Sequence, residues 1–360
     1  MIFLLIAFGV SFLLCWWMVR YWGVKDVTEG VQKFHSWDAV RTGGVALYGS
    51  MLAVGGAFWW VGKDFWGEFF KVLVVSLPVF LGGLAEDITK RVSPRVRLSL
   101  AFLSGFMGGL LLDAHLLRVD VPFVDPLLAK VTVFSLLFTS FALAGSSNAF
   151  NIIDGFNGLA GGVGIIVFLA YAYVSFLLND WFLLYLSLAF ASALLGFFLW
   201  NFPMGFVFLG DSGAYLSGFL AGLVGVLMVN RHSEVSAWFP LTLLFYPIWE
   251  TLFSILRKKF LRGTSPFEPD PLHFHMMIHR RIVKMFLGEV VSERLKNSLT
   301  SPYLWFMQIL CTVPAVLFWK STPLLVLSCV LYATFYVWLY FRIVSFKTPS
   351  LLKGFLKLLK

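Results

Sequence analysis

The chain has 360 residues, of which 59% are hydrophobic and only 13% are charged. Soluble domains carry about 25% charged residues, so this composition excludes a soluble globular protein, and its hydrophobicity excludes an intrinsically disordered one. The net charge of +9 at pH 7 would suit a nucleic-acid binder, but the positions of the basic residues explain it differently.

Eleven apolar runs approach the length needed to cross a bilayer, which is about 20 residues for a helix. In chain order they cover roughly 2–19, 45–62, 70–85, 97–112, 131–147, 159–178, 181–200, 213–229, 237–256, 302–319 and 322–341. The sequence therefore predicts an all-α, polytopic membrane protein with about eleven transmembrane helices. The first run has no basic start and no small residue before Cys15, so we expect a span and not a cleaved signal peptide.

Lys and Arg are divided unequally between the two sets of loops that alternate along these spans. Twenty-two of the 28 basic residues fall in the loops after spans one, three and nine and in the C-terminal tail, and six fall in the other set. Because basic residues in short loops stay on the cytoplasmic side, we expect a periplasmic N-terminus and a cytoplasmic C-terminus. This distribution also explains the net charge without nucleic acid.

We expect residues 1–342 to form a single transmembrane domain and residues 343–360 to form a basic tail that lies against anionic lipid. In the predicted cytoplasmic loops, acids and amides stand in glycine-rich, otherwise apolar sequence. An ionisable group is costly there and indicates a functional site. These loops are 20–45, 86–97, 148–160, 201–212 and 257–300.

The loop after the third span places two acids before a basic run. Glu86 and Asp87 close the span. The basic residues that follow are Lys90, Arg91, Arg95 and Arg97. A positive-inside loop with incidental acids is one interpretation. An anion-binding site beside a metal ion is the other.

Polar residues recur at intervals of three between the fifth and sixth spans. Asn148, Asn151 and Asp154 would share one face of a helix. Asp154-Gly155 then predicts a turn, and the glycines that follow allow backbone to approach a ligand closely. With Asn157 this makes four acids or amides in ten residues, more than helix caps need.

Asp211 opens the eighth span, between Phe-Leu-Gly and Ser-Gly. A carboxylate at the start of a helix can be only a cap, or it can bind a cation. Carboxylates that converge at one membrane face repel each other unless a cation joins them, and Mg²⁺ usually binds one or two carboxylates plus substrate phosphates. Together with Asp154 and the pair Glu86-Asp87, Asp211 therefore predicts a magnesium site.

The loop after the ninth span carries His273, His275 and His279, followed by Arg280. Zinc is the weaker interpretation, because this H-x-H has no cysteine and no third ligand at a familiar spacing. Donors for a phosphate or a sugar are the stronger one, with a plain surface loop as the alternative. Carboxylates for Mg²⁺ beside phosphate donors suit phosphoryl transfer, and a lipid-borne acceptor would explain a site at the membrane.

Four motifs resemble those of one known family. They are N-A-F-N-I-I-D-G-F-N-G-L-A at 148–160, F-L-G-D-S-G-A at 208–214, E-D-x-x-x-x-x-S-P-R-x-R-L at 86–98 and P-D-x-x-H-x-H at 269–275. Their order along the chain is that of the polyprenyl-phosphate N-acetylhexosamine-1-phosphate transferases, a glycosyltransferase family 4-like group that they resemble. K-F-H at 33–35 with R-T-G-G at 41–44 resembles the family's first cytoplasmic loop.

The resemblance implies a transferase that moves a sugar 1-phosphate from a UDP-sugar to polyprenyl phosphate and releases UMP, with Mg²⁺ as cofactor and Mn²⁺ as the alternative metal. It implies that Asp211 and Asp154 bind the metal, and that Asp87, with Glu86 in place of the family's first aspartate, joins them in the catalytic set. The residues that the motifs and loops nominate for substrate binding are Lys33, Arg41, Lys90, Arg95, Asn148, Asn151, Asn157, His273, His275 and Arg280.

Two departures from the family pattern concern Asn157 and Met276. Asn157 stands where many members have a second aspartate, and Met276 replaces the next histidine of the histidine loop. A run of three adjacent histidines would be typical of the phospho-N-acetylmuramoyl-pentapeptide transferase of peptidoglycan synthesis, which is the alternative. Its absence favours the branch that starts cell-surface polysaccharides such as lipopolysaccharide O-antigen.

That branch would use undecaprenyl phosphate and an N-acetylated hexosamine at the cytoplasmic face of the bacterial inner membrane. The expected partners are the UDP-sugar, undecaprenyl phosphate and membrane lipid, without nucleic acid, and a homodimer is left open. A transporter is the other alternative, but transporters usually show repeated halves and polar groups at the midplane, and no repeat is visible. A CDP-alcohol phosphotransferase would need a D-G-x-x-A-R run, which is absent.

Overall fold

The computed structural model describes residues 1–22, 39–262, 272–288 and 291–345. Apart from one isolated parallel bridge, this part of the chain consists of helices and their connections. The α-helices are α1 (Ile2–Tyr21), α2 (Gly43–Val61), α3 (Trp66–Thr89), α4 (Pro94–Leu112), α5 (Asp125–Lys130), α6 (Thr132–Ile153), α7 (Leu159–Leu177), α8 (Trp181–Asn201), α9 (Gly210–Arg231), α10 (Trp238–Leu243), α11 (Phe245–Arg257), α12 (Phe274–Ile278), α13 (Lys284–Leu287), α14 (Glu293–Ser298), α15 (Ser301–Leu317) and α16 (Thr322–Val344). Two π-helical turns cover Lys258–Arg262 and His279–Val283.

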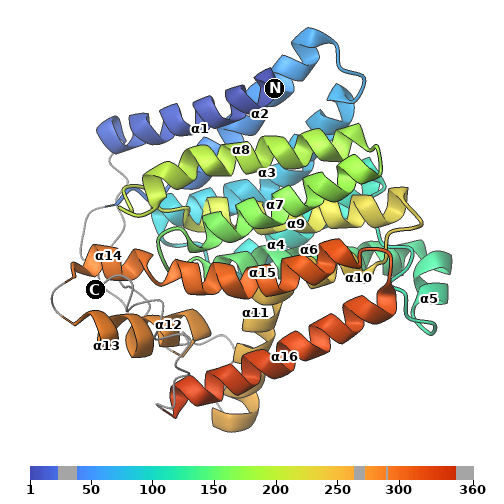
Figure 1. Cartoon of the computed structure of the whole chain (residues 1–360). Coiled ribbons are helices and arrows are strands. Elements are labelled where there is room, and N and C mark those ends of the chain that lie inside the picture. The colour runs from blue at the N-terminus through green and yellow to red at the C-terminus, as the bar shows by residue number, and fades with distance from the viewer. Residues whose placement is uncertain (23–38, 263–271, 289–290, 346–360) are drawn as a thin grey trace.

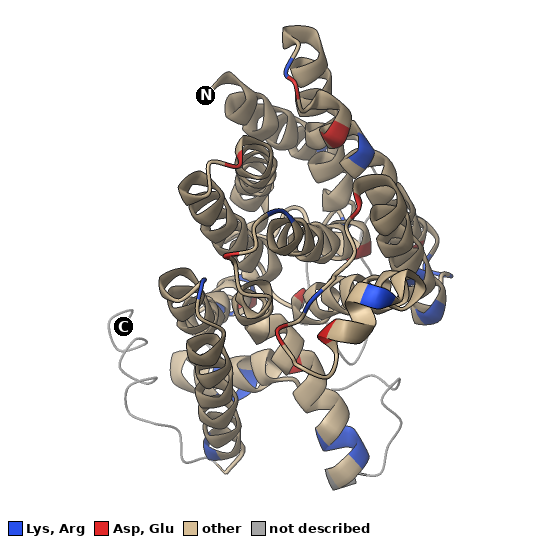
Figure 2. Cartoon of the chain, turned by 90° about the vertical axis from the view of Figure 1, so that its right-hand side faces the viewer, with Lys and Arg blue, Asp and Glu red and all other residues tan. Residues whose placement is uncertain are grey.

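The predicted class is confirmed: within the described ranges, ten helical stretches are long and apolar enough to cross a membrane. They are α1, α2, α3, α4, α6, α7, α8, α9, the stretch from α14 to α15, and α16. Most of them run side by side as a bundle (Figure 1). Figure 2 shows long helical stretches without a charged residue, as a lipid-facing bundle requires.

The predicted ninth span, 237–256, is not one helix. It is divided into α10 and α11 at Leu244, and α11 turns across the direction of the bundle (Figure 1). Pro247 has no N–H to donate to the carbonyl of Leu243, which removes a helical hydrogen bond. The Gln308 side chain on α15 donates to that carbonyl instead, with Nε2 2.8 Å from the oxygen, so the break is stabilised from outside.

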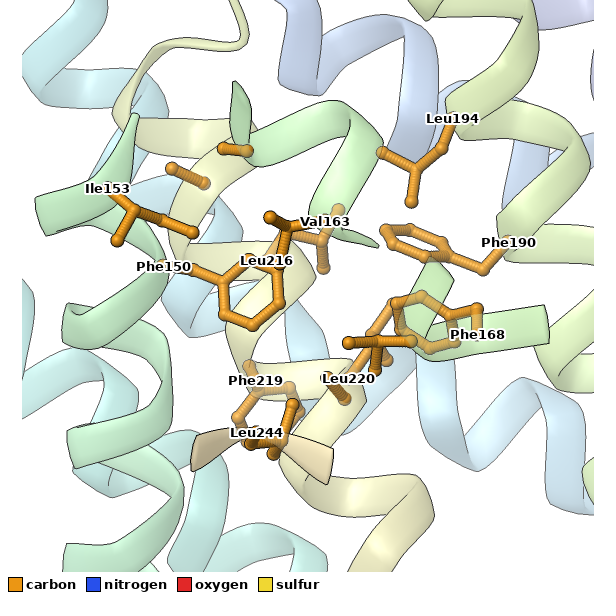
Figure 3. Close-up of a cluster of buried hydrophobic side chains, with 14 of the residues drawn as sticks. Phe150, Ile153, Val163, Phe168, Phe190, Leu194, Leu216, Phe219, Leu220 and Leu244 are labelled. Atoms are coloured by element: carbon orange, nitrogen blue, oxygen red, sulfur yellow. The ribbon is translucent and has the colours of Figure 1, made fainter. Parts of the chain in front are cut away.

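Helix α9 lies at the centre of the bundle, and 94% of its span is buried. Figure 3 shows the apolar packing around it, which joins α6, α7, α8 and α9. The side chains labelled there are Phe150, Ile153, Val163, Phe168, Phe190, Leu194, Leu216, Phe219, Leu220 and Leu244. Since lipid tails are as apolar as these side chains, close van der Waals packing drives such association.

Small residues let α2 and α3 reach the first turn of α9. A Cβ atom on Gly44 would lie 2.4 Å from the backbone nitrogen of Gly213, and one on Gly83 would lie 2.5 Å from the Cα of Ser212. No larger residue fits at either contact. The first turn of α9, which contains Asp211, is therefore fixed against two neighbouring helices.

The loops that the sequence nominated for function gather at one end of the bundle. The connections α3–α4, α6–α7 and α8–α9 lie at the end where α12, α13 and α14 are found, opposite α5 (Figure 1). Which end faces the cytoplasm stays a prediction. Lys33 and the tail 346–360 lie outside the described residues.

Candidate active site

A cavity of about 320 Å³ opens among these loops. It is lined by Arg41, Glu86, Arg97, Asn151, Asp154, Gly155, Phe156, Asn157, Asn201, Phe208, Gly210, Asp211 and Asn297. Six of the residues nominated from the sequence are therefore brought together: Arg41, Glu86, Asn151, Asp154, Asn157 and Asp211. Segments far apart in the chain meet at one polar space.

Asp211 lies in the first turn of α9 with its side chain only 10% exposed. Its Oδ1 atom is 3.2 Å from Nη2 of Arg41, and its Oδ2 atom forms an ion pair with Nη1 of Arg97. The Arg97 guanidinium also lies over the ring of Tyr215, 5.6 Å from its centroid. Two guanidinium groups thus balance the charge of Asp211. Arg97 was not among the nominated site residues, although the R-x-R of its motif signalled it.

Asp87 is fully buried and caps the start of α9. Its Oδ1 accepts a hydrogen bond from the backbone N–H of Asp211 (2.8 Å), and its Oδ2 accepts from the backbone N–H (2.9 Å) and hydroxyl (2.6 Å) of Ser212. Arg41 adds an ion pair, with Nε 3.2 Å from Oδ1. A negative charge there is stabilised because helix N-termini present unpaired N–H groups and a positive dipole end.

The approach of Asp87 requires a glycine at the position before Asp211. Gly210 has φ +70, and a Cβ there would lie 2.1 Å from the carbonyl oxygen of Arg41 and 2.7 Å from Asp87 Oδ2. Asp87 is not among the residues that line the cavity. Its contacts position the backbone of Asp211 and the side chain of Arg41.

A short backbone pairing holds Arg41 at the cavity. The N–H of Val40 donates to the carbonyl of Phe206 (3.1 Å), and the N–H of Phe208 donates to the carbonyl of Val40 (2.7 Å). The N–H of Gly43 then donates to the carbonyl of Phe208 (3.0 Å). The segment before α2 is therefore tied to the segment that leads into α9, and Arg41 faces the carboxylates.

Glu86 lines the cavity and also shapes the turn between α3 and α4. Its Oε2 accepts a hydrogen bond from the backbone N–H of Val92 at 2.8 Å. Lys90 and Arg95 lie on the exposed side of this turn and are not among the lining residues. The two basic residues flank the site without entering the cavity.

The amide-rich end of α6 divides between two environments. Asn151 and Asp154 line the cavity, and Asp154-Gly155 forms the predicted turn. Asn148, one turn earlier, accepts a hydrogen bond from the hydroxyl of Tyr215 on α9 at 3.3 Å and is not a lining residue. The interval of three residues placed Asn151 and Asp154 together as expected, while Asn148 faces the neighbouring helix.

Asn157 is 2% exposed and ties three segments together. Its Nδ2 donates to the carbonyl of Pro203 (3.3 Å) and to the hydroxyl of Ser298 (3.1 Å), and its backbone N–H donates to Oδ1 of Asn297 (2.8 Å). Both side-chain contacts with Pro203 and Ser298 use the NH₂ group. An amide suits these neighbours, which explains why an aspartate is not needed here.

We therefore expect Asn157→Asp to destabilise the protein by about 1–3 kcal/mol, because a carboxylate cannot donate to Pro203 and is left buried against a carbonyl. Protonation restores one donor, so the loss should be smaller at pH 5 than at pH 7. Thermal unfolding in detergent at pH 7 and at pH 5 measures the loss of stability and its dependence on pH. Asn179→Asp, at an exposed position, is the control, and equal unfolding temperatures for the two variants would refute this role.

The histidines nominated from the sequence lie beside the cavity and are buried. His273 and His275 have stacked rings with centroids 5.2 Å apart, and His275 is 0% exposed. A Cβ on Gly155 would lie 3.1 Å from Nε2 of His275, so this nitrogen faces a residue that lines the cavity. Arg280 is exposed and is not a lining residue.

His279 packs against Phe156, with ring centroids 4.9 Å apart, and its Nδ1 is 2.9 Å from the hydroxyl oxygen of Thr300. Burial disfavours the charged ring and, with the nearby Lys284, lowers the pKa of His279 to about 3. This ring is therefore neutral at physiological pH. It supports the loop that contains Phe156.

Glu250 is a residue that the sequence interpretation missed. It lies on α11, is 1% exposed, and its Oε1 is 3.4 Å from Nδ1 of His273 and 3.6 Å from Nδ1 of His275. The signal was present, because one acid inside the apolar run 237–256 marks a functional or structural site by its cost alone.

The donor atoms at the cavity fit a magnesium ion shared with a substrate. Among the described residues, no group of three or more His, Cys, Asp or Glu side chains could hold a metal ion alone. Glu86, Asp154 and Asp211 nevertheless line the same cavity and supply the hard oxygen atoms that Mg²⁺ prefers. Mg²⁺ usually takes one or two carboxylates and completes its shell with phosphates and water.

The fold and cavity define a polytopic, all-α membrane protein with a polar site at one end of its bundle. Residues 69–229 match the model of glycosyl transferase family 4, which confirms the resemblance seen in the motifs. The chain is 29% identical over 213 residues to the undecaprenyl-phosphate alpha-N-acetylglucosaminyl 1-phosphate transferase of Thermotoga maritima. The matched region covers 58% of this chain and 61% of that relative.

Two further relatives show the same relationship. The chain is 33% identical over 159 residues to the phospho-N-acetylmuramoyl-pentapeptide-transferase of Staphylococcus carnosus, covering 44% of this chain and 47% of the relative. It is 26% identical over 228 residues to a probable undecaprenyl-phosphate N-acetylglucosaminyl 1-phosphate transferase of Bacillus subtilis, covering 56% and 63%. The chain thus matches less than two thirds of the length of each of these relatives.

Proposed function

We propose that this protein transfers an N-acetylhexosamine 1-phosphate from a UDP-sugar to undecaprenyl phosphate and releases UMP, in a reaction that depends on Mg²⁺. One observation carries the proposal: Glu86, Asp154 and Asp211 share a cavity with Arg41 and Arg97 at the end of a membrane bundle. Phosphoryl transfer needs positioned charges of both signs. The names of the relatives support this choice.

In this reaction an oxygen of the acceptor phosphate bonds to the phosphorus that carries the sugar. The bond from that phosphorus to the bridging oxygen breaks, and UMP leaves with the oxygen. A bound Mg²⁺, held by Asp211 and Asp154, would neutralise charge on the diphosphate. Arg41 and Arg97 are placed to orient phosphate oxygens, and Asn151 is placed to bind the sugar or the base.

The acceptor needs no general base. A phosphate monoester has a second pKa near 6, so at neutral pH it is already mostly dianionic. The carboxylates therefore act by positioning and by binding the metal. Asp87 contributes indirectly, because it fixes the backbone of Asp211 and the side chain of Arg41.

The second candidate is the peptidoglycan reaction, because a relative named phospho-N-acetylmuramoyl-pentapeptide-transferase is 33% identical over its matched region. Met276 in place of a third histidine favours the polysaccharide-initiating branch. The test uses purified protein, undecaprenyl phosphate and a panel of UDP-N-acetylhexosamines together with UDP-N-acetylmuramoyl-pentapeptide. UMP and lipid-linked product are measured with Mg²⁺ and with EDTA.

We expect product from a UDP-N-acetylhexosamine, loss of product in EDTA and recovery when Mg²⁺ is added back. Product from the muramoyl-pentapeptide substrate alone would select the second candidate. No UMP from any donor would refute both.

We also propose that the cavity faces the cytoplasm, since 22 of the 28 basic residues lie in loops and a tail assigned to that side. Reporter proteins fused after Lys360 and inside the connection 113–130 measure this. The reporter after Lys360 should lie in the cytoplasm, and the reporter inside 113–130 should lie on the periplasmic side of the inner membrane. A periplasmic signal after Lys360 would reverse the assignment.

A further inference from the structure

We infer that Glu250 is a positioning residue that sets the tautomer of His273 and His275 and directs Nε2 of His275 toward the cavity. The inference extends the proposed transferase function to a residue outside the four sequence motifs. It rests on the contacts of a single buried carboxylate.

The Glu250 carboxylate gathers donors from two other segments. Its Oε1 accepts a hydrogen bond from the backbone N–H of Phe274 at 2.7 Å and faces Nδ1 of His273 and His275. Its Oε2 accepts a hydrogen bond from the hydroxyl of Tyr336 on α16 at 2.8 Å. A buried charge is tolerated only when such partners compensate for lost hydration. Here both oxygens have partners.

The position of the carboxylate selects one form of each imidazole ring. A neutral imidazole carries its proton on one nitrogen and accepts at the other. Oε1 of Glu250 lies 3.4 Å from Nδ1 of His273 and 3.6 Å from Nδ1 of His275, which is ion-pair range and longer than a hydrogen bond. The negative charge beside both Nδ1 atoms favours the proton on Nδ1. Nε2 then carries the lone pair and is the acceptor of each ring.

The geometry links this choice to the cavity. Nε2 of His275 faces Gly155, which lines the cavity directly after Asp154. A line of contacts therefore runs from Tyr336 through Glu250 and His275 to the loop that carries Asp154. If Glu250 served only to join α11 to α16, its contact with Tyr336 would be sufficient. The two imidazole rings beside its other oxygen would then have no role.

The experiment compares Glu250→Gln, His275→Asn and the double variant. Gln keeps the volume and an acceptor for the N–H of Phe274, but it removes the charge. Tyr332→Phe is the matched control, because Tyr332 lies one turn before Tyr336 on α16 and its ring packs against Phe245, with centroids 5.7 Å apart. The readouts are kcat/KM for the UDP-sugar, thermal unfolding, and nitrogen NMR of ¹⁵N-histidine in wild type and variants.

We expect Glu250→Gln to lower kcat/KM by about tenfold or more, as loss of a partner that orients a functional histidine does. Tyr332→Phe should stay within about threefold of wild type, a loss below about 0.7 kcal/mol. The double variant should be no more than about threefold worse than His275→Asn alone, because the carboxylate acts through the ring. The wild-type spectrum should show His273 and His275 protonated at Nδ1.

Losses that multiply in the double variant would overturn the inference, as would a Glu250→Gln variant within threefold of wild type. Protonation of His275 at Nε2 alone in the wild-type spectrum would also overturn it. That spectrum needs no turnover and no Glu250 variant, because the signals that disappear in His275→Asn identify His275, so it decides the tautomer even if Glu250→Gln fails to fold. If the wild type releases no UMP, the proposed function fails, while the spectrum still tests the role of Glu250.

Discussion

Asp211→Asn is expected to lower turnover by at least about 100-fold, the loss typical when a preorganised charge at a reacting group is removed. The amide keeps the shape of the side chain but not the charge that pairs with Arg41 and Arg97 and that is proposed to bind Mg²⁺. Initial rates at saturating Mg²⁺ and UDP-sugar measure the effect. Unfolding in detergent should stay cooperative, since Asp211 is not the residue that caps α9.

Asp180→Asn is the matched control for this variant. Asp180 also stands at the start of a membrane helix, where it caps α8 by accepting a hydrogen bond from the N–H of Leu183 at 2.9 Å. Asn is as good a cap as Asp, so activity should remain near that of the wild type. Mg²⁺-dependent turnover of Asp211→Asn at the level of this control would refute the metal assignment.

Asp87→Asn is expected to lower both stability and turnover. The carboxylate accepts hydrogen bonds from two backbone N–H groups and one hydroxyl, whereas an amide turns its own NH₂ toward one of these donors. A buried donor left unsatisfied costs about 1–3 kcal/mol. The displaced first turn of α9 then moves Asp211, and we expect a rate loss of about 100-fold at every pH between about 6 and 9.

The pH–rate profile separates positioning from base catalysis. A general base would give a profile that follows its own pKa, so recovery of Asp87→Asn at high pH would show that proton removal was its task. Glu86→Asp is the comparison. It restores the family's usual pair but shortens the side chain that bonds the N–H of Val92, so we expect a smaller loss than for Asp87→Asn.

The spans could be read from the sequence because each needs only a run of about 20 apolar residues. The division into α10 and α11 could not, since the apolar composition continues through Pro247 and the compensating donor is Gln308, far along the chain. The local composition of the sequence does not show that Gln308 will donate a hydrogen bond to the carbonyl of Leu243.

The membership of the site was similarly easier to predict than its geometry. Glu86, Asp154 and Asp211 were nominated by their cost in apolar sequence, and they share the cavity. The orientation of Asp87 depends on where α3 meets α9, and the role of Glu250 depends on where α11 meets α12 and α16. Such long-range contacts leave no local pattern.

Because two arginines share the Asp211 carboxylate, the proposed metal ion and diphosphate would bind cooperatively. A divalent cation that approaches Asp211 must compete with Arg41 and Arg97, and an anionic diphosphate that approaches the arginines must compete with Asp211. If both ligands bound together, the cation would release the arginines for the diphosphate, and the diphosphate would release Asp211 for the cation. Because such coupling is reciprocal, the diphosphate should tighten metal binding by the same factor by which the metal tightens diphosphate binding.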